Sequence, residues 1–185
     1  MNAIELMTYE HVFIRRMLTV MRRFSYRLMN NPSMDVSDAP KMIDFVRQYA
    51  DKHHHGKEED LLFNRMVEHL GTAAEKLVKN GMLVEHDLGR LHMKLMEEGI
   101  ASFEAGNDEA RLDIIGNAIA YAQLLDRHIS KEDDMVYTFA WRHFDSDIIE
   151  TINRETTEFE AKAESEGVQS NYLKLLEEME AKYLK

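Results

Sequence analysis

One short stretch of the sequence holds three imidazoles and two carboxylates. Residues 53–63 are HHHGKEEDLLF, so these side chains are followed directly by an apolar turn. Residues four apart on a helix lie one above the other on the same face. His54 and Glu58 would therefore point the same way, and so would His55 and Glu59. A histidine and a glutamate placed in this way can bind a metal ion through nitrogen and oxygen.

The same His-x-x-x-Glu spacing occurs again at His128 and Glu132, where it also precedes apolar residues. Two further histidines, His11 and His86, lie in the apolar stripes of two other predicted helices. One histidine on an apolar face is more often a core residue than a metal ligand. Four of them on four helices, with two glutamates that are costly to bury unpaired, instead predict a cation among them.

Four amphipathic helices would position these side chains. Apolar residues recur at intervals of three and four over residues 3–29, 38–71, 72–105 and 108–142. The third helix is open to a break at residues 80–81, an Asn-Gly pair that is typical of a turn. Because the connections are short, the sequence predicts an all-α fold, an up-down-up-down four-helix bundle.

The chain changes character after residue 145. Residues 146–185 are acidic, weakly apolar and divided at Gly167, which predicts one or two appended helices. The expected domains are therefore a bundle over residues 1–145 and a C-terminal helical extension over residues 146–185. We expect the partners of this extension to be a second copy of the chain, in a homodimer, or another protein.

The composition excludes several classes of protein. Only 2 of the 185 residues are proline and 8 are glycine, which favours helices. The absence of cysteine excludes disulfides, thiolate metal sites and iron–sulfur clusters. A net charge of −11 argues against nucleic acid as a partner. No apolar run approaches the roughly 20 residues of a membrane span and no signal-peptide pattern begins the chain, so we expect a cytoplasmic protein that does not enter the membrane.

The candidate ligands are limited to nitrogen and oxygen. This donor set suits iron, manganese or zinc and disfavours copper(I). The Glu-x-x-His motif of ferritin-type sites does not occur at any histidine of the sequence. The His-Glu-x-x-His motif of zinc proteases is also absent. The spacing alone therefore predicts a metal site without selecting the metal.

Four segments of the sequence resemble the hemerythrin-like, or HHE cation-binding, family. They are Glu10-His11-x-x-Ile14-Arg15, His54-His55-Gly56-Lys57-Glu58-Glu59-x-x-Leu62-Phe63, Glu85-His86-Asp87-x-Gly89-Arg90 and His128-Ile129-x-Lys131-Glu132-Asp133. They follow the family's order between about residues 5 and 142. The resemblance implies a non-haem di-iron site inside a four-helix bundle. It assigns ligands to one iron (His11, His54), to the other iron (His86, His128) and to both as bridges (Glu58, Glu132).

The sequence departs from the oxygen carriers of this family at two places. They have another histidine one turn after the one that matches His86, where this chain has Arg90. Their final bridge is an aspartate five residues after its histidine, where this chain has Glu132 four residues after His128. One iron would then be open or would take another ligand, such as Tyr49 or Tyr121. As core tyrosines, these two residues need no such role.

The register of the second helix also has two solutions, because His55 and Glu59 have the same separation as His54 and Glu58. The family match at residues 62–63 favours the first pair as ligands. We expect the second pair to form a flanking shell or a solvated edge.

The resemblance favours a non-haem di-iron protein that binds or reacts with dioxygen, peroxide or nitric oxide, as a sensor, a scavenger or a small redox protein. One alternative is an iron-responsive regulatory or interaction module, in which iron holds the bundle folded. Another is iron delivery or the repair of iron centres, although the repair proteins carry a cysteine-bearing segment that this chain lacks. Enzymatic activity is left open, and no catalytic residue is assigned beyond the metal ligands.

Overall fold

The first long helix shows how local sequence signals produce this structure, a computed structural model that describes residues 1–31 and 33–185. Helix α1 (Ala3–Asn30) begins with a capping box. The Asn2 side chain accepts a hydrogen bond from the Glu5 backbone N–H at 3.0 Å, and the Glu5 carboxylate accepts one from the Asn2 N–H at 2.9 Å. The helix buries one face, which contains Met7, His11 and Ile14. His11 thus enters the interior within the apolar stripe.

The second helical segment contains two π-helical stretches. It runs through α2 (Ala39–Phe45), η1 (Val46–His55), η2 (Glu58–Phe63) and α3 (Asn64–His69). Gly71, with φ of 74°, separates it from the next segment. A π-helix has more residues per turn than an α-helix and is frequent at functional sites. The faces predicted from α-helical spacing therefore shift in this segment.

The third and fourth segments each contain a π-helical stretch as well. The third runs through α4 (Gly71–Leu77), η3 (Val78–Met82) and α5 (Leu83–Glu104). The fourth runs through η4 (Asp108–Ala110), α6 (Arg111–Lys131), η5 (Glu132–Val136) and α7 (Tyr137–His143). The chain does not break at residues 80–81, which lie within η3. The Asn-Gly pair is accommodated by the wider helical turn.

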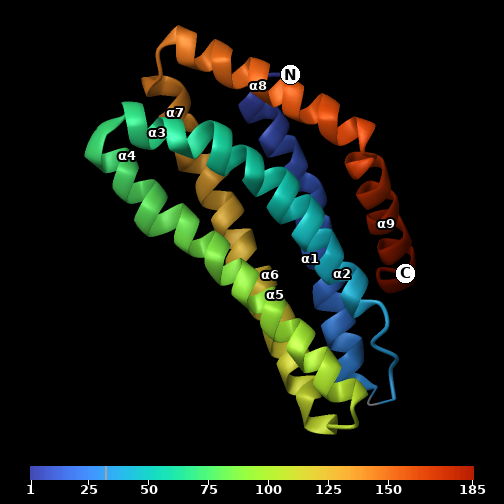
Figure 1. Ribbon diagram of the computed structural model, residues 1–185. Coiled ribbons are helices and arrows are strands. Elements are labelled where there is room, and N and C mark those ends of the chain that lie inside the picture. The colour runs from blue at the N-terminus through green and yellow to red at the C-terminus, as the bar shows by residue number, and fades with distance from the viewer. Residues whose placement is uncertain (32) are drawn as a thin grey trace.

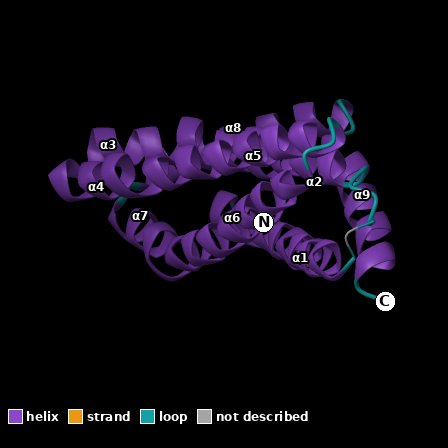
Figure 2. Ribbon diagram, turned by 90° about the horizontal axis from the view of Figure 1, so that it is seen from below, coloured by secondary structure: helices purple, strands orange, loops and turns teal. Residues whose placement is uncertain are grey.

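Figures 1 and 2 show how these segments are arranged. The chain crosses the length of the molecule four times before α8, and α5 lies beside α6. Helix α6 also packs against α1. The structure has no strand in the part of the chain that it describes. The prediction of an all-helical bundle is confirmed.

Two further helices lie on the outside of the bundle (Figure 1). They are α8 (Ser146–Ser165) and α9 (Val168–Tyr183), joined at Gly167, where φ is 74°. Helix α9 packs against α1, and its buried residues Leu176, Met179 and Tyr183 belong to the larger core cluster. The apolar side of α9 is therefore used within the chain. The division into domains at residue 145 stays a prediction.

Two apolar clusters divide the interior along its length. One includes Ile14, Ala50, Met93 and Leu125. The other includes Met7, Leu62, Met82 and Val136. On each long segment, the candidate ligands occupy the positions between a residue of one cluster and a residue of the other. A layer of polar side chains is thus enclosed by apolar packing on both sides.

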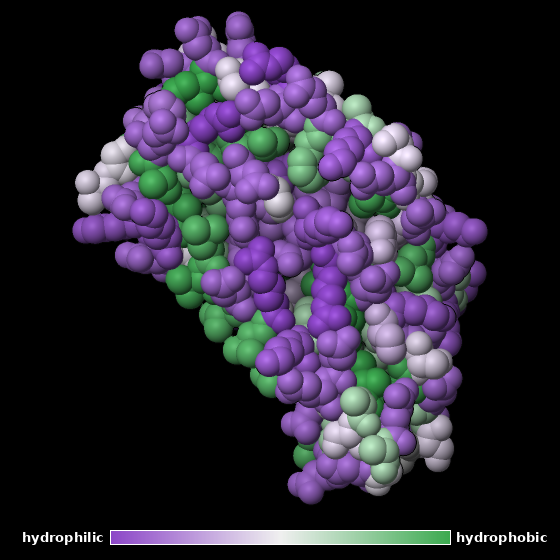
Figure 3. All heavy atoms as spheres, viewed as in Figure 1, coloured by the Kyte–Doolittle hydropathy of each residue, from purple (hydrophilic) through white to green (hydrophobic). Residues whose placement is uncertain are grey.

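The surface is polar over most of the face in Figure 3, with apolar patches between the charged side chains. None of the helices in the described residues has the length and apolar character that are needed to cross a membrane.

Candidate metal centre

All six residues assigned from the sequence meet in the polar layer. They are brought together from α1 (His11), η1 (His54), η2 (Glu58), α5 (His86), α6 (His128) and η5 (Glu132), and all are buried. Their ligand atoms form two groups, and within each group the atoms lie within 4.8 Å of one another. One group is His11, His54, Glu58 and Glu132; the other is His55, Glu58, His86 and His128. Glu58 belongs to both groups, so the two groups adjoin.

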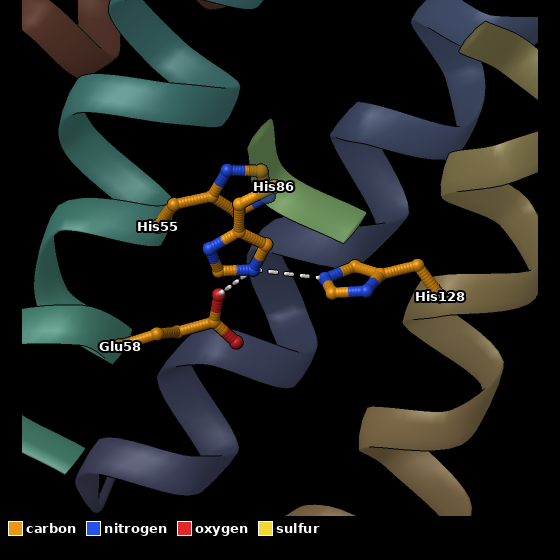
Figure 4. Close-up of side chains that lie close together, drawn as sticks. All are labelled: His55, Glu58, His86 and His128. Atoms are coloured by element: carbon orange, nitrogen blue, oxygen red, sulfur yellow. Dashed lines mark hydrogen bonds and ion pairs between the residues drawn. The ribbon is translucent and has the colours of Figure 1, made fainter. Parts of the chain in front are cut away.

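The second group is drawn in Figure 4, where its side chains converge from three helical segments. The Nε2 atoms of His86 and His128 lie 3.0 Å apart, and His86 Nε2 is 3.7 Å from a Glu58 oxygen. The ring of His55 is stacked on that of His86, with centroids 3.7 Å apart. His55 therefore occupies the position in this group that the sequence left open.

The second pair was expected to form a flanking shell or a solvated edge. Glu59 flanks the layer, because it holds His86, but His55 is buried and is not at a solvated edge. His54 and His55 are neighbours in sequence, yet both are buried and both face the polar layer. In an α-helix, adjacent side chains point about 100° apart. The π-helical stretches η1 and η2 change the register, so that both imidazoles lie within reach of Glu58.

The first group contains a tyrosine that the sequence analysis missed. The Tyr137 hydroxyl donates a hydrogen bond to the Glu58 carboxylate and lies 3.4 Å from His11 Nε2. His11 Nε2 is 3.4 Å from a Glu132 oxygen, and His54 Nε2 is 3.7 Å from a Glu58 oxygen. Tyr137 is the first residue after η5, and the α-helical stripe did not place it on the inner face. It adds an oxygen donor to this group.

A carboxylate orients each of the five imidazoles. The Nδ1 atom of each of the five rings forms a hydrogen bond with an acidic side chain. The Nε2 atom of each ring is therefore directed to the centre of the layer. The bonds join His11 to Asp133 (2.7 Å), His54 to Glu10 (2.8 Å), His55 to Asp51 (3.3 Å), His86 to Glu59 (2.6 Å) and His128 to Glu85 (2.9 Å). Metal-binding histidines commonly have such a partner, which sets the tautomer and the ring orientation.

Four of these carboxylates connect neighbouring segments in one direction around the bundle. Glu10 of α1 holds His54, Glu59 of η2 holds His86, Glu85 of α5 holds His128, and Asp133 of η5 holds His11. The ring is closed, because the last bond returns to α1. Each of these four histidines is therefore positioned by a residue of another helical segment, whereas His55 is held by Asp51 of its own segment.

The polar layer fits a cation because several of its atoms have no partner within the protein. His54 Nε2, Glu58 Oε2 and both carboxylate oxygens of Glu132 are buried without a hydrogen bond. Buried polar atoms almost always have partners in folded proteins. The unpaired atoms all face the layer that the imidazole Nε2 atoms face. A nitrogen and oxygen donor set of this kind suits iron, manganese or zinc.

The two glutamates ionise differently in the protein without metal. Burial, and then the charge of Glu132, raise the pKa of Glu58 well above its ordinary value. Burial would raise the pKa of Glu132 too, but the imidazoles of His128, His11 and His86 outweigh it and lower that pKa. Two neighbouring buried carboxylates do not both ionise easily. A cation that binds here would replace the proton on Glu58.

The imidazoles also differ in their pKa values, which are lowered for two of them and raised for two others. Burial, followed by the neighbouring His11, lowers the pKa of His54 to about 4. Burial and His86 lower the pKa of His55. Burial opposes the charge on His11 and His86, but bonds and attraction to nearby carboxylates raise the pKa of both. His54 and His55 are therefore neutral near pH 7, as metal binding requires.

A buried lysine connects this layer to the C-terminal helices. Lys57 is fully buried, and its ammonium donates to Glu10 and to Glu160 of α8. It also lies 3.2 Å from Nε2 of His53, which is itself 3.0 Å from Glu10. Because Glu10 holds the candidate ligand His54, this lysine balances the charge directly behind the polar layer.

Replacement of Lys57 by methionine is expected to destabilise the chain strongly, because it leaves Glu10 buried without its ammonium partner. Breaking a buried ion pair on one side costs about 3–5 kcal/mol. Lys52→Met is the matched control, since Lys52 is exposed on the same helical segment. Denaturant unfolding measures the difference. Equal stabilities of the two variants would show that the charge of Lys57 is not needed.

The remaining candidates lie outside the ligand layer. Arg90 is exposed and pairs with Asp51 and Glu59, each at 2.7 Å. His92 bonds to Asn117 at 3.1 Å. His69 and His143 are in neither of the two ligand groups. Tyr49 is buried, and its ring lies beside that of His53, with centroids 5.5 Å apart. Tyr121 lines a cavity beside His55 and His86.

The comparison with protein families agrees with this geometry. The hemerythrin HHE cation-binding domain model matches residues 2–140, which is most of the chain. The chain belongs to the hemerythrin HHE cation-binding family. The match ends before α8, so the two C-terminal helices lie outside the family domain. Searches of curated proteins and of solved structures found no match.

Membership of the family implies cation binding, and the two groups of histidine and glutamate are suited to that role. The matched range contains every residue of both groups. It also contains the five carboxylates that hold the imidazoles. The enclosed polar layer between the two apolar clusters is therefore the candidate cation site of this family member.

Proposed function

We propose that this protein binds two non-haem iron ions in the polar layer and binds or reacts with a small ligand there: dioxygen, peroxide or nitric oxide. The observation that carries the proposal is the position of the two glutamates. One Glu132 oxygen lies 3.0 Å from His128 Nε2 and the other 3.4 Å from His11 Nε2. Glu58 likewise has one oxygen near His54 and the other near His86, each at 3.7 Å. Both carboxylates thus span the two groups, as bridging ligands do.

The protein would hold the two ions with unequal sets of side chains. His11, His54 and the Tyr137 hydroxyl would serve one ion, and His55, His86 and His128 the other, with the glutamates shared. Bound iron would supply the electrons for a reaction with the small ligand. The side chains keep the imidazoles in one orientation through their carboxylate partners. The apolar clusters on both sides exclude bulk water from the layer.

A cavity of about 260 Å³ gives access to the side with three imidazoles. Its lining includes His55, His86 and Tyr121. Two arginines at the cavity already have acidic partners, because Arg90 pairs with Asp51 and Arg47 with Glu97. These two arginines therefore add no unpaired positive charge to the lining. The Tyr121 hydroxyl is buried without a hydrogen-bond partner and can donate to a small ligand.

Mixing the iron-loaded protein with each ligand tests this function. We expect protein prepared without oxygen to change its optical spectrum on addition of nitric oxide, hydrogen peroxide or air. Tyr121→Phe should keep its iron and bind the ligand more weakly, by about 2- to 10-fold, the effect of one hydrogen bond. Tyr49→Phe is the control, because Tyr49 is a buried tyrosine that does not line this cavity. No spectral change with any of the three ligands would contradict the function. Equal affinities of the two variants would contradict only the role of Tyr121.

One observation favours an iron-responsive regulatory module as the second candidate. Helix α8 lies outside the family domain, yet its Glu160 bonds to Lys57 behind the ligand layer. A change of charge in the layer would thus reach a helix that is exposed to partners. Limited proteolysis within α8 should differ between iron-loaded and metal-free protein if this candidate is correct. Identical cleavage of the two forms would count against it.

A further inference from the structure

Helix α5 has a row of apolar side chains on the face opposite the core. Val84, Leu88, Leu91 and Leu95 are exposed to 46%, 41%, 45% and 37% respectively. They are separated alternately by four and three residues, which places them in one line along the helix. The buried face of α5 contains His86, Gly89, Met93 and Met96. In Figure 3, a row of apolar residues follows the lower left edge of the molecule, where Figure 1 shows α5.

No element within the described residues covers this row. Helices α8 and α9 pack elsewhere, and the buried side chains of α9 belong to the core beside α1. The C-terminal extension is therefore not the cover for α5. A line of large aliphatic side chains at alternating four- and three-residue spacing is the seam of a helix pair. The spacing points to another helix as the missing partner.

We propose that the row on α5 binds the α5 helix of a second copy of this chain in an antiparallel pair. Two-fold symmetry requires that each contact occur twice. With the helices antiparallel, Leu88 of each copy faces Leu91 of the other. Val84 of each copy then faces Leu95 of the other. Four apolar layers form with no polar residue among them.

Charges beside the row support this occupant and this orientation. Asp87 and Lys94 are exposed, and each directly precedes a leucine of the row on the same side of it. The antiparallel pair places Asp87 of one copy beside Lys94 of the other, twice. In a parallel pair, Lys94 would lie opposite Gly99 and have no acidic partner there. Within the described residues, each group has an exposed partner on α5, Arg90 for Asp87 and Glu98 for Lys94. Such pairs are weak and can rearrange.

The size of the surface sets the strength of the expected association. Helix α5 has 22 residues and is therefore about 33 Å long. A single helix pair of this length lies at the low end of specific interfaces. The net charge of −11 on each chain also opposes association. We expect a reversible dimer whose fraction depends on concentration between about 10 μM and 1 mM, the range of weak affinities.

Sedimentation equilibrium of the full chain tests the surface. Leu88→Glu places two carboxylates in the central layers and should weaken the dimer at least 10-fold. Leu112→Glu is the control, because Leu112 is exposed to 67% at the start of α6 and is not in the row. Circular dichroism and metal content of each variant show that the fold is retained. A chain that stays monomeric at 1 mM, or equal dimerisation of the two variants, would overturn the proposal.

Charge exchange tests the orientation separately. Asp87→Lys and Lys94→Asp should each weaken the dimer several-fold, since each places like charges side by side. The double variant restores opposite charges and should recover most of the affinity. If the double variant loses as much dimer affinity as the two single variants lose together, the antiparallel pairing is wrong. Dimerisation is measured without any small ligand, so this result is independent of the proposed function.

Discussion

Replacement of Glu132 by alanine is expected to reduce the bound iron to one ion per chain or fewer. Glu132 has one oxygen near His128 and the other near His11, and neither oxygen has a hydrogen-bond partner. It is therefore positioned to serve both ions. The loss of a shared ligand affects both ions at once, which makes this one of the largest single effects that we expect at the site. Metal analysis of protein prepared without oxygen measures it.

The control for this variant is Asp134→Ala. Asp134 lies two residues further along the same π-helical segment but is exposed. It should bind iron as the unaltered chain does. If Glu132→Ala keeps two ions per chain, Glu132 is not a bridge and the assignment of ligands is wrong.

Removal of the metal is expected to destabilise the protein, and the loss should grow as the pH rises above 6.5. Without metal, the folded state raises the pKa of Glu58, His11 and His86, so these groups keep protons that the unfolded chain releases. Groups with a raised pKa stabilise the fold below their unfolded pKa, and this contribution is lost as the pH rises through their folded pKa. The metal-free chain should therefore become less stable from pH 6.5 to pH 8.5.

The iron-loaded protein should show the opposite trend, because metal binding requires deprotonated ligands and becomes stronger with pH. His54 and His55 act in another range: their lowered pKa values destabilise the metal-free fold only as the pH falls below 6.5. Thermal unfolding of both forms measures the difference. We expect the gap in Tm to widen by several degrees over the range, since about 1 kcal/mol shifts Tm by about 2–4 °C at this length. A constant gap would show that the ligands do not exchange protons for metal.

Much of the site could be predicted from the sequence because helical spacing reports which residues share a face. His11, His54, Glu58, His86, His128 and Glu132 were chosen from spacing and family resemblance, and the structure brings them together. The ligand layer also falls between apolar residues on every segment, which is the pattern that the stripes indicated. Their roles as ligands stay a proposal.

Spacing offered His55 only as the alternative to His54, and it did not identify Tyr137, because the prediction assumed α-helical turns. Both lie in or directly after a π-helical segment, where the faces shift. Nothing in the apolar spacing of the sequence marks these wider turns. The one signal for a π-helical stretch is the cluster of histidines and glutamates within a few residues, because π-helical stretches are frequent at functional sites.

The carboxylates that hold the imidazoles did leave a signal in the sequence. Glu10, Glu59, Glu85 and Asp133 each adjoin a candidate ligand along the chain. Each holds a histidine of a different helix, so the pairing could not be predicted without the packing of the bundle. The acidic residues beside the candidate ligands nevertheless indicate that other carboxylates surround the site.

The most direct test of the central claim is X-ray absorption spectroscopy, with metal analysis, on iron-loaded protein prepared without oxygen. Two ions that share Glu58 and Glu132 should give two irons per chain and an iron–iron separation of roughly 3.5–4 Å, the spacing of two-metal sites. The nearest neighbours of iron should be nitrogen and oxygen only. One iron per chain, or two irons without a short iron–iron separation, would contradict a shared centre.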